Sequence, residues 1–71
     1  MKLCSRRRQL TRVEVEAVTA GDVIEVQFPE EEPGFWCVVG TESFGRAPVV
    51  VPSERRGPLR VVPRGAHVWM H

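Results

Sequence analysis

The chain has 71 residues, of which 42% are hydrophobic and 27% are charged, a composition typical of one small folded domain. A chain this short buries only about 60% of its unfolded surface, so it has room for one core and for no second domain. Ten basic residues against nine acidic ones give a net charge of +1, which excludes a uniformly basic nucleic-acid-binding chain and an acidic solvating tail.

The N-terminal segment MKLCSRRRQLTR is basic, but VEVEAV follows it in place of the apolar stretch of a signal peptide. The longest uninterrupted apolar run, FWCVV, is far shorter than the roughly 20 residues of a membrane-spanning helix. Two cysteines, Cys4 and Cys37, are too few for the disulfide framework of a small secreted domain. We therefore expect a cytoplasmic protein that does not associate with a membrane.

Short strands joined by tight turns are predicted by a period of two in the apolar residues and by six glycines and six prolines, which leave no room for a long helix. Residues 1–11 form a basic arm, for which both a short helix and disorder are open. The folded domain is expected over residues 12–71. Its first strand is RVEVEAV at 12–18, where apolar residues alternate with glutamates. The turn TAGD connects it, as a hairpin, with a second strand, VIEVQF at 23–28, whose apolar residues share one face.

The remaining elements follow at short intervals. The segment PEEEPG is predicted to be a solvated loop, because prolines and like charges oppose strand pairing. FWCVV at 35–39 is apolar on both faces and is therefore expected in the middle of the sheet, covered on each side. VVV between Pro48 and Pro52 is expected at an edge, since proline cannot donate to a strand ladder. Two further strands are expected, LRVV at 59–62 and HVWM at 67–70.

The fold class that follows is all-β. Five to six short antiparallel strands with no helix to cover them must bury their apolar faces against one another, and a strongly bent sheet closed into a small barrel achieves this at small size. Such a barrel has no pocket of the few hundred cubic ångströms that small ligands occupy, so neither a cofactor nor a small-molecule substrate is expected.

The elements GDVIEV, FWCVVG and PLRVVPRGAHVWM, in this order, resemble the SH3-like small β-barrel superfold, and more narrowly the short uncharacterised barrel proteins of actinobacteria, their plasmids and their phages. The resemblance covers about residues 12–70 and includes no catalytic motif. It implies a nucleic-acid-associated barrel, a docking module for RNA polymerase or ribosomes, or a virion component. The chain lacks the tyrosines of the branch that binds proline-rich peptides and has too few aromatic residues for a methyl-lysine cage.

Charge is concentrated in three blocks. Residues 1–12 carry +5, residues 13–42 carry −8 and residues 43–71 carry +4. The folded surface is therefore expected to be dipolar, which steers and orients binding partners. The alternative is that acidic and basic segments neutralise each other across neighbouring strands.

Arginine is the residue type that points most directly to a binding site, because its guanidinium group binds phosphate through two donors and stacks on bases. On the last strand His67 and Trp69 share a face. If that face points outward, Trp69 is a candidate anchor for a partner; the alternative is that it caps the open end of the barrel. The candidate binding residues are Arg6, Arg7, Arg8, Arg55, Arg56, Arg60, Arg64 and Trp69.

Residue spacing gives little support to metal binding or catalysis. Cys4, Cys37, His67 and His71 are residue types that zinc accepts, but neither cysteine has a second ligand nearby in a tight turn. The chain contains no P-loop, no dinucleotide-binding fingerprint and no nucleophile elbow. We therefore predict no catalytic residue, no bound metal and no enzymatic activity.

Two hypotheses of function remain. The leading one is a non-enzymatic binding module, a small bacterial or phage accessory protein that docks onto a larger protein or nucleoprotein assembly through its charged surface. The alternative is direct binding of DNA or RNA by the arginine set, with Trp69 or Phe44 as a stacking platform for bases.

Overall fold

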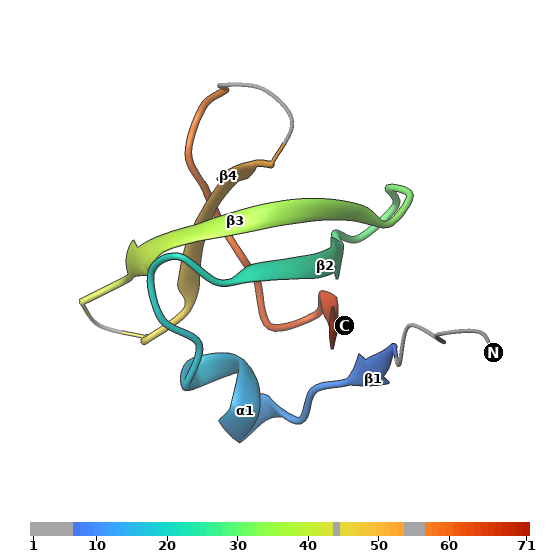
Figure 1. Ribbon diagram of the computed structural model, residues 1–71, viewed down its shortest axis with the longest axis horizontal. Coiled ribbons are helices and arrows are strands. Elements are labelled where there is room, and N and C mark those ends of the chain that lie inside the picture. Colours follow the sequence, from blue (N-terminus) through green and yellow to red (C-terminus); the bar gives the residue numbers. More distant parts are fainter. Residues whose placement is uncertain (1–6, 44, 54–56) are drawn as a thin grey trace, which may run out of the picture.

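The computed structural model of the chain describes residues 7–43, 45–53 and 57–71. Its elements in chain order are β1 (Arg8–Gln9), α1 (Arg12–Glu16), β2 (Val23–Gln27), β3 (Gly34–Thr41), β4 (Pro48–Pro52), β5 (Arg60–Val61) and β6 (His67–Met70). The six strands form one antiparallel sheet in the order β1-β6-β2-β3-β4-β5 (Figure 1). The predicted all-β fold class is therefore confirmed.

The hydrophobic core lies on one face of this sheet, which we call the inner face. Ile24, Val26, Val38, Val50 and Val68 are each no more than 2% exposed there and come from β2, β3, β4 and β6. The alternation in VIEVQF accounts for the contribution of β2, because successive side chains of a strand point to opposite faces. The second predicted strand is thus confirmed, and its apolar side lines the core.

The predicted closure into a barrel does not occur within the described residues. β1 and β5 lie at the two ends of the strand order. Each of them has only two residues. Strands this short form few ladder hydrogen bonds, so the two ends of the sheet do not meet and a gap remains between them. Figure 1 shows the strong bend that remains, with β4 crossing behind β3 at a steep angle.

The strand predicted for RVEVEAV is wrong, because this segment forms the helix α1. Thr11 and Glu14 form a capping box: the Glu14 carboxylate accepts the Thr11 N–H at 2.9 Å, and the Thr11 hydroxyl oxygen accepts the Glu14 N–H at 3.2 Å. Val15 packs against the core, whereas Val13 is 74% exposed. The predicted hairpin between 12–18 and 23–28 is therefore also wrong.

The turn predicted at TAGD does exist, but it joins α1 to β2. Gly21 has a φ of 101°, a conformation that glycine adopts without steric cost. The Asp22 carboxylate accepts the Thr19 N–H at 3.0 Å. Gly21 N–H and the Asp22 carbonyl both bond to Val38 in β3, each at 2.8 Å, so the turn is tied to the sheet.

The expected positions of two strands are corrected by the sheet order. β4 is not at an edge, since it pairs with β3 on one side and β5 on the other. Pro48 and Pro52 occupy the ends of β4, which leaves the N–H groups of the valines between them available for pairing. β3 is central as expected, but it is not covered on both faces, because Phe35 is 50% exposed.

The last residues of the segment 1–11, predicted as a basic arm, contact the sheet. Arg8 and Gln9 pair with β6, and the Leu10 N–H donates to the Val68 carbonyl at 2.8 Å. The Leu10 side chain is 8% exposed and belongs to the core. Strand β1 therefore begins at Arg8, inside the segment 1–11 predicted as a basic arm, and residues 1–6 of that segment lie outside the described residues. No helix among the described segments has the length and apolarity needed to cross a bilayer.

Substitution of the helix cap tests the reassignment of residues 12–16. We expect Thr11→Ala to lower the free energy of unfolding by about 1 kcal/mol, because it removes the hydroxyl that accepts the Glu14 N–H. Thr11→Ser keeps that acceptor and is expected to unfold like the native chain. Urea denaturation followed by circular dichroism measures both variants. Equal stability of the alanine and serine variants would contradict the capped helix.

Candidate binding site

The described arginines of the candidate set are largely paired with carboxylates of the acidic block. Arg7 pairs with Glu25 at 2.9 Å, Arg8 with Glu14 at 2.7 Å and Arg60 with Glu31 at 2.9 Å. For these three arginines the observed arrangement is the alternative one, in which acidic and basic segments neutralise each other. Arg64 is exposed in the β5–β6 connection and forms no ion pair within the described residues. The candidates Arg6, Arg55 and Arg56 lie outside the described residues.

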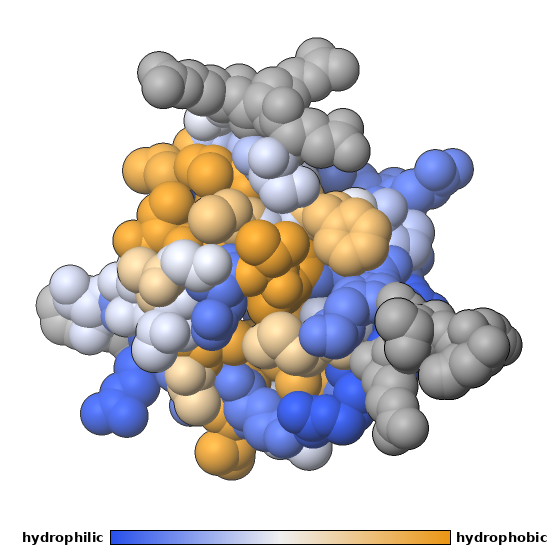
Figure 2. All heavy atoms as spheres, in the orientation of Figure 1, coloured by the Kyte–Doolittle hydropathy of each residue, from blue (hydrophilic) through white to orange (hydrophobic). Residues whose placement is uncertain are grey.

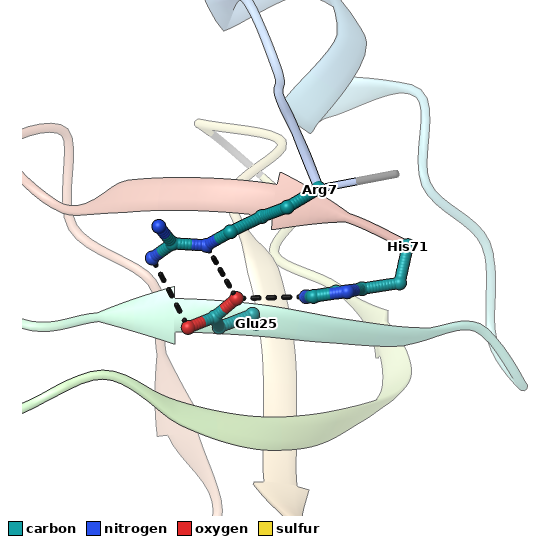
Figure 3. Close-up of polar contacts among 3 residues, drawn as sticks. All are labelled: Arg7, Glu25 and His71. Carbon is teal, nitrogen blue, oxygen red and sulfur yellow. Dashed lines mark hydrogen bonds and ion pairs between the residues drawn. The ribbon is translucent and has the colours of Figure 1, made fainter. Parts of the chain in front are cut away.

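One carboxylate, that of Glu25 in β2, joins both ends of the described chain (Figure 3). Arg7 donates from Nε to Oε1 at 2.9 Å and from its terminal nitrogen to Oε2 at 3.1 Å, the two-donor geometry of a strong guanidinium–carboxylate pair. His71 Nε2 lies 2.7 Å from the same Oε1. Arg7 precedes β1 and His71 follows β6, so this cluster attaches both segments to β2.

The Arg7 guanidinium is the main reason that the pKa of Glu25 is lowered from its ordinary value, and the contact with His71 acts in the same direction. The Glu25 side chain is only 13% exposed, whereas that of Arg7 is 46% exposed. A carboxylate held ionised in this way is suited to fastening β1 to the sheet. It is poorly suited to accepting a proton as a general base at neutral pH.

Strand register places Glu25 in a row of paired residues that crosses four strands. Gln9 in β1 pairs with Trp69 in β6, Trp69 with Glu25, and Glu25 with Phe35 in β3. Paired residues of an antiparallel sheet share a face, so this row lies on the face opposite the core, which we call the outer face. The outward orientation considered for Trp69 is thus the one observed. Its ring is covered by Arg7, whose guanidinium carbon lies 4.0 Å from the ring centroid.

Apolar side chains continue from this row along the outer face. In the neighbouring row, Val23 pairs with Cys37, and Cys37 with Val51. Val23 is 51% exposed and Phe35 is 50% exposed, unusually high values for large apolar residues within a sheet. We call Val23, Phe35, Cys37 and Val51 the outer patch. In Figure 2 apolar atoms gather on the left and in the centre of the view, in the region where Figure 1 draws β3.

Arg60 serves the stability of the fold. Its guanidinium carbon lies 3.7 Å from the Phe28 ring centroid and 5.4 Å from that of Trp36. Phe28 and Trp36 themselves meet edge to face at 5.1 Å. Two hydrogen bonds to Glu31, at 3.1 and 2.9 Å, lower the pKa of that carboxyl group and hold the acidic loop against β5. Trp36 is half-buried against the core beneath this contact.

A groove lies between the two ends of the sheet, where the barrel does not close. Its volume of about 450 Å³ corrects the expectation that the domain has no pocket of ligand size. The physical reason is the gap left by the short end strands. The groove is lined by Leu10, Arg12, Val15 and Glu16 on the side of α1, and by Glu42, Gly45, Ala47, Pro48, Val61, Val62, Pro63, Arg64 and Ala66 on the other side.

Neither surface forms a recognisable metal site. Within the described residues no group of three or more histidine, cysteine, aspartate or glutamate side chains could hold a metal ion. Cys37, His67 and His71 are therefore not brought together by the fold; instead His67 Nδ1 lies 3.1 Å from Nε2 of the Gln9 side chain. Cys4, the fourth residue considered as a zinc ligand, lies outside the described residues.

The residues that sequence reasoning missed are Glu25 and His71 in the cluster, and Val23 and Phe35 in the outer patch. The alternation in VIEVQF was sufficient to place Glu25 opposite the core. FWCVV is apolar on both faces, so its sequence contains no signal that Phe35 is exposed. Comparison of the chain with protein-family models, with curated proteins and with solved structures found no match.

The Glu25 cluster makes the attachment of β1 dependent on pH. Because the pKa of Glu25 is lowered in the folded state, its contribution to stability is present above its ordinary value of 4.5 and is lost as the pH falls below that value. We expect the stability of the native chain to fall more steeply between pH 5 and about pH 3 than that of Glu25→Gln. Glu30→Gln, in the exposed loop, is the control and is expected to follow the native chain.

Urea denaturation at a series of pH values measures these slopes, and the indole resonance of Trp69 reports on the loss of the Arg7 contact. Arg7→Ala is expected to lower stability at neutral pH and to reduce the difference in pH dependence between the chain with Glu25 and the chain with Glu25→Gln, because only the His71 contact then remains. An Arg7→Ala variant as stable as the native chain would contradict the role of the cluster and would restore the prediction that residue 7 belongs to a free arm.

Proposed function

We propose that the chain is a non-enzymatic binding module of the SH3-like class, a small bacterial or phage accessory protein that docks onto a larger protein or nucleoprotein assembly in the cytoplasm. Its docking surface is the outer patch. The observation that carries this proposal is the exposure of Val23 and Phe35, each about half accessible to solvent on adjacent strands of the sheet.

The surroundings of the outer patch support protein docking. The row that begins at Phe35 continues into Glu25 and Trp69, and Arg7 forms an ion pair with Glu25, so an apolar centre meets a border that carries paired charges. This arrangement corresponds to the apolar core and polar rim of protein interfaces. Exposed apolar side chains that adjoin one another on a soluble domain are characteristic of interaction sites.

The pairing of arginines weakens the alternative of direct nucleic-acid binding. Arg7, Arg8 and Arg60 each face a glutamate, so their charge is largely cancelled before any phosphate approaches. The alternative then depends on Arg64 and on the three candidates outside the described residues. The resemblance to the SH3-like class is compatible with both protein docking and nucleic-acid binding, so the two hypotheses are tested separately below.

Substitution in the outer patch tests the docking proposal. We expect Phe35→Asp to keep the fold, because the Phe35 side chain is already 50% exposed, and to abolish capture of the partner from a lysate of the native host. Val13→Asp, at a 74% exposed position of α1, is the matched control and is expected to capture the same proteins as the native chain. Mass spectrometry with and without nuclease identifies the captured proteins. Unchanged capture by Phe35→Asp would contradict the assignment of the outer patch.

A salt titration tests the nucleic-acid alternative separately. Direct binding to random duplex or single-stranded oligonucleotides would weaken steeply as the salt concentration rises, because each neutralised phosphate releases a counterion. We expect no binding in fluorescence anisotropy even at low salt. Tight, salt-sensitive binding that Arg64→Ala weakens would favour the alternative over protein docking.

A further inference from the structure

The groove between α1 and β5 differs from the outer patch in shape, position and charge. Its floor includes the buried side chains of Leu10 and Val62, which are 8% and 3% exposed. Its walls carry four charged side chains, Arg12 and Glu16 from α1 and Glu42 and Arg64 from the other side. None of these four forms an ion pair with another described residue.

We propose that the groove binds an extended segment of a partner protein, which pairs with the open edge of β5 and carries an acidic and a basic side chain on either side of an apolar centre. The site goes beyond the docking surface proposed above and uses none of the outer-patch residues.

The open edge of β5 supplies main-chain partners for such a segment. The Val62 N–H donates to the Pro48 carbonyl in β4 at 2.9 Å. Successive residues of a strand direct their main-chain groups to opposite sides, so the N–H and carbonyl of Val61 face away from β4, toward the open side. β5 is the last strand of the order and Val61 lines the groove. An extended peptide binds at such an edge by adding one strand to the sheet.

The floor of the groove accommodates the side chains of the added strand. Val15 and Val61 line the groove on its two sides, Val62 lies in its floor, and proline and alanine residues complete the apolar surface. A volume of about 450 Å³ is enough for a few small apolar side chains. Burial of these side chains is the main source of binding free energy, while the edge of β5 sets the direction of the peptide.

The charged side chains of the two walls indicate which charges the bound segment carries. The walls carry two arginines and two glutamates, so their charges balance. A balanced rim gives no net attraction for the phosphates of a nucleic acid or for an anionic lipid surface. A peptide with one acidic and one basic residue matches both signs, since each wall offers one cation and one anion.

The probe for this site is the acetylated and amidated peptide Glu-Val-Thr-Val-Arg, titrated into the isotopically labelled full chain and followed by nuclear magnetic resonance. We expect saturable shifts of the amide resonances of Leu10, Val61, Val62 and Ala66, together with slower hydrogen exchange at the Val61 N–H. Replacement of the central threonine of the peptide by proline removes a main-chain donor and is expected to weaken binding about fivefold.

Two variants of the chain distinguish the groove from adventitious contact. Arg64→Glu is expected to weaken binding of the peptide about threefold, and exchange of the peptide's glutamate for lysine is expected to restore it. Arg46→Glu changes the same charge at an exposed position outside the groove and is expected to bind like the native chain. Both positions are exposed, so neither variant is expected to unfold.

Three outcomes would overturn the proposal: no saturable shift at peptide concentrations of about 5 mM, shifts that map to the outer patch, or equal binding by native chain and Arg64→Glu. Phe35→Asp is expected to bind the peptide like the native chain. Failure of peptide binding would therefore leave the outer patch assignment intact, and loss of docking through the outer patch would leave the groove intact.

Discussion

Strand β2 determines what lies on each face of the sheet. Ile24 and Val26 are 0% exposed, so Glu25 between them must point to the outer face. Pairing with β3 and β6 then sets Phe35 and Trp69 level with Glu25. A slip of one residue would bury the carboxylate and expose both apolar side chains, which is why this register is strongly specified. The exposure of the outer patch and the attachment of β1 both depend on that register.

Ion pairs between the basic and acidic blocks hold segments of the chain together. They do not build the dipolar surface that the sequence predicted. Arg7 approaches Glu25 because β1 joins the sheet beside β6, and Arg60 approaches Glu31 because the acidic loop folds back toward β5. Each pair leaves less net charge for steering a partner. The outer patch remains exposed on the outer face, and the two arginines and two glutamates of the groove form no ion pair with another described residue. Both features favour protein ligands over polyanions.

The groove is a consequence of strand length. β1 and β5 have two residues each, so they cannot complete a closed ladder, and α1 flanks the opening instead. A closed barrel has no free strand edge. In this sheet the edge of β5 is free of a strand partner among the described residues and lies beside the apolar floor of the groove. The same short strands that prevent closure therefore leave the edge at which we propose that an additional strand binds.

The sequence by itself predicted the strand VIEVQF and its buried face, because Ile24, Val26 and Phe28 alternate with polar residues and a turn precedes them. It also predicted a strand at HVWM, but left open which of its faces points outward. It did not resolve RVEVEAV, where alternation also fits a short helix, although the spacing of Thr11 and Glu14 was a local signal for a helix start. The sequence singled out the candidate arginines, but it did not predict which glutamates they contact. Arg7 and Glu25 are 18 positions apart, and Arg60 and Glu31 are 29 apart, so only strand pairing brings them together. The open edge of β5 was likewise decided by the tertiary structure, since closure depends on the lengths and positions of β1 and β5, the strands at the two ends of the sheet.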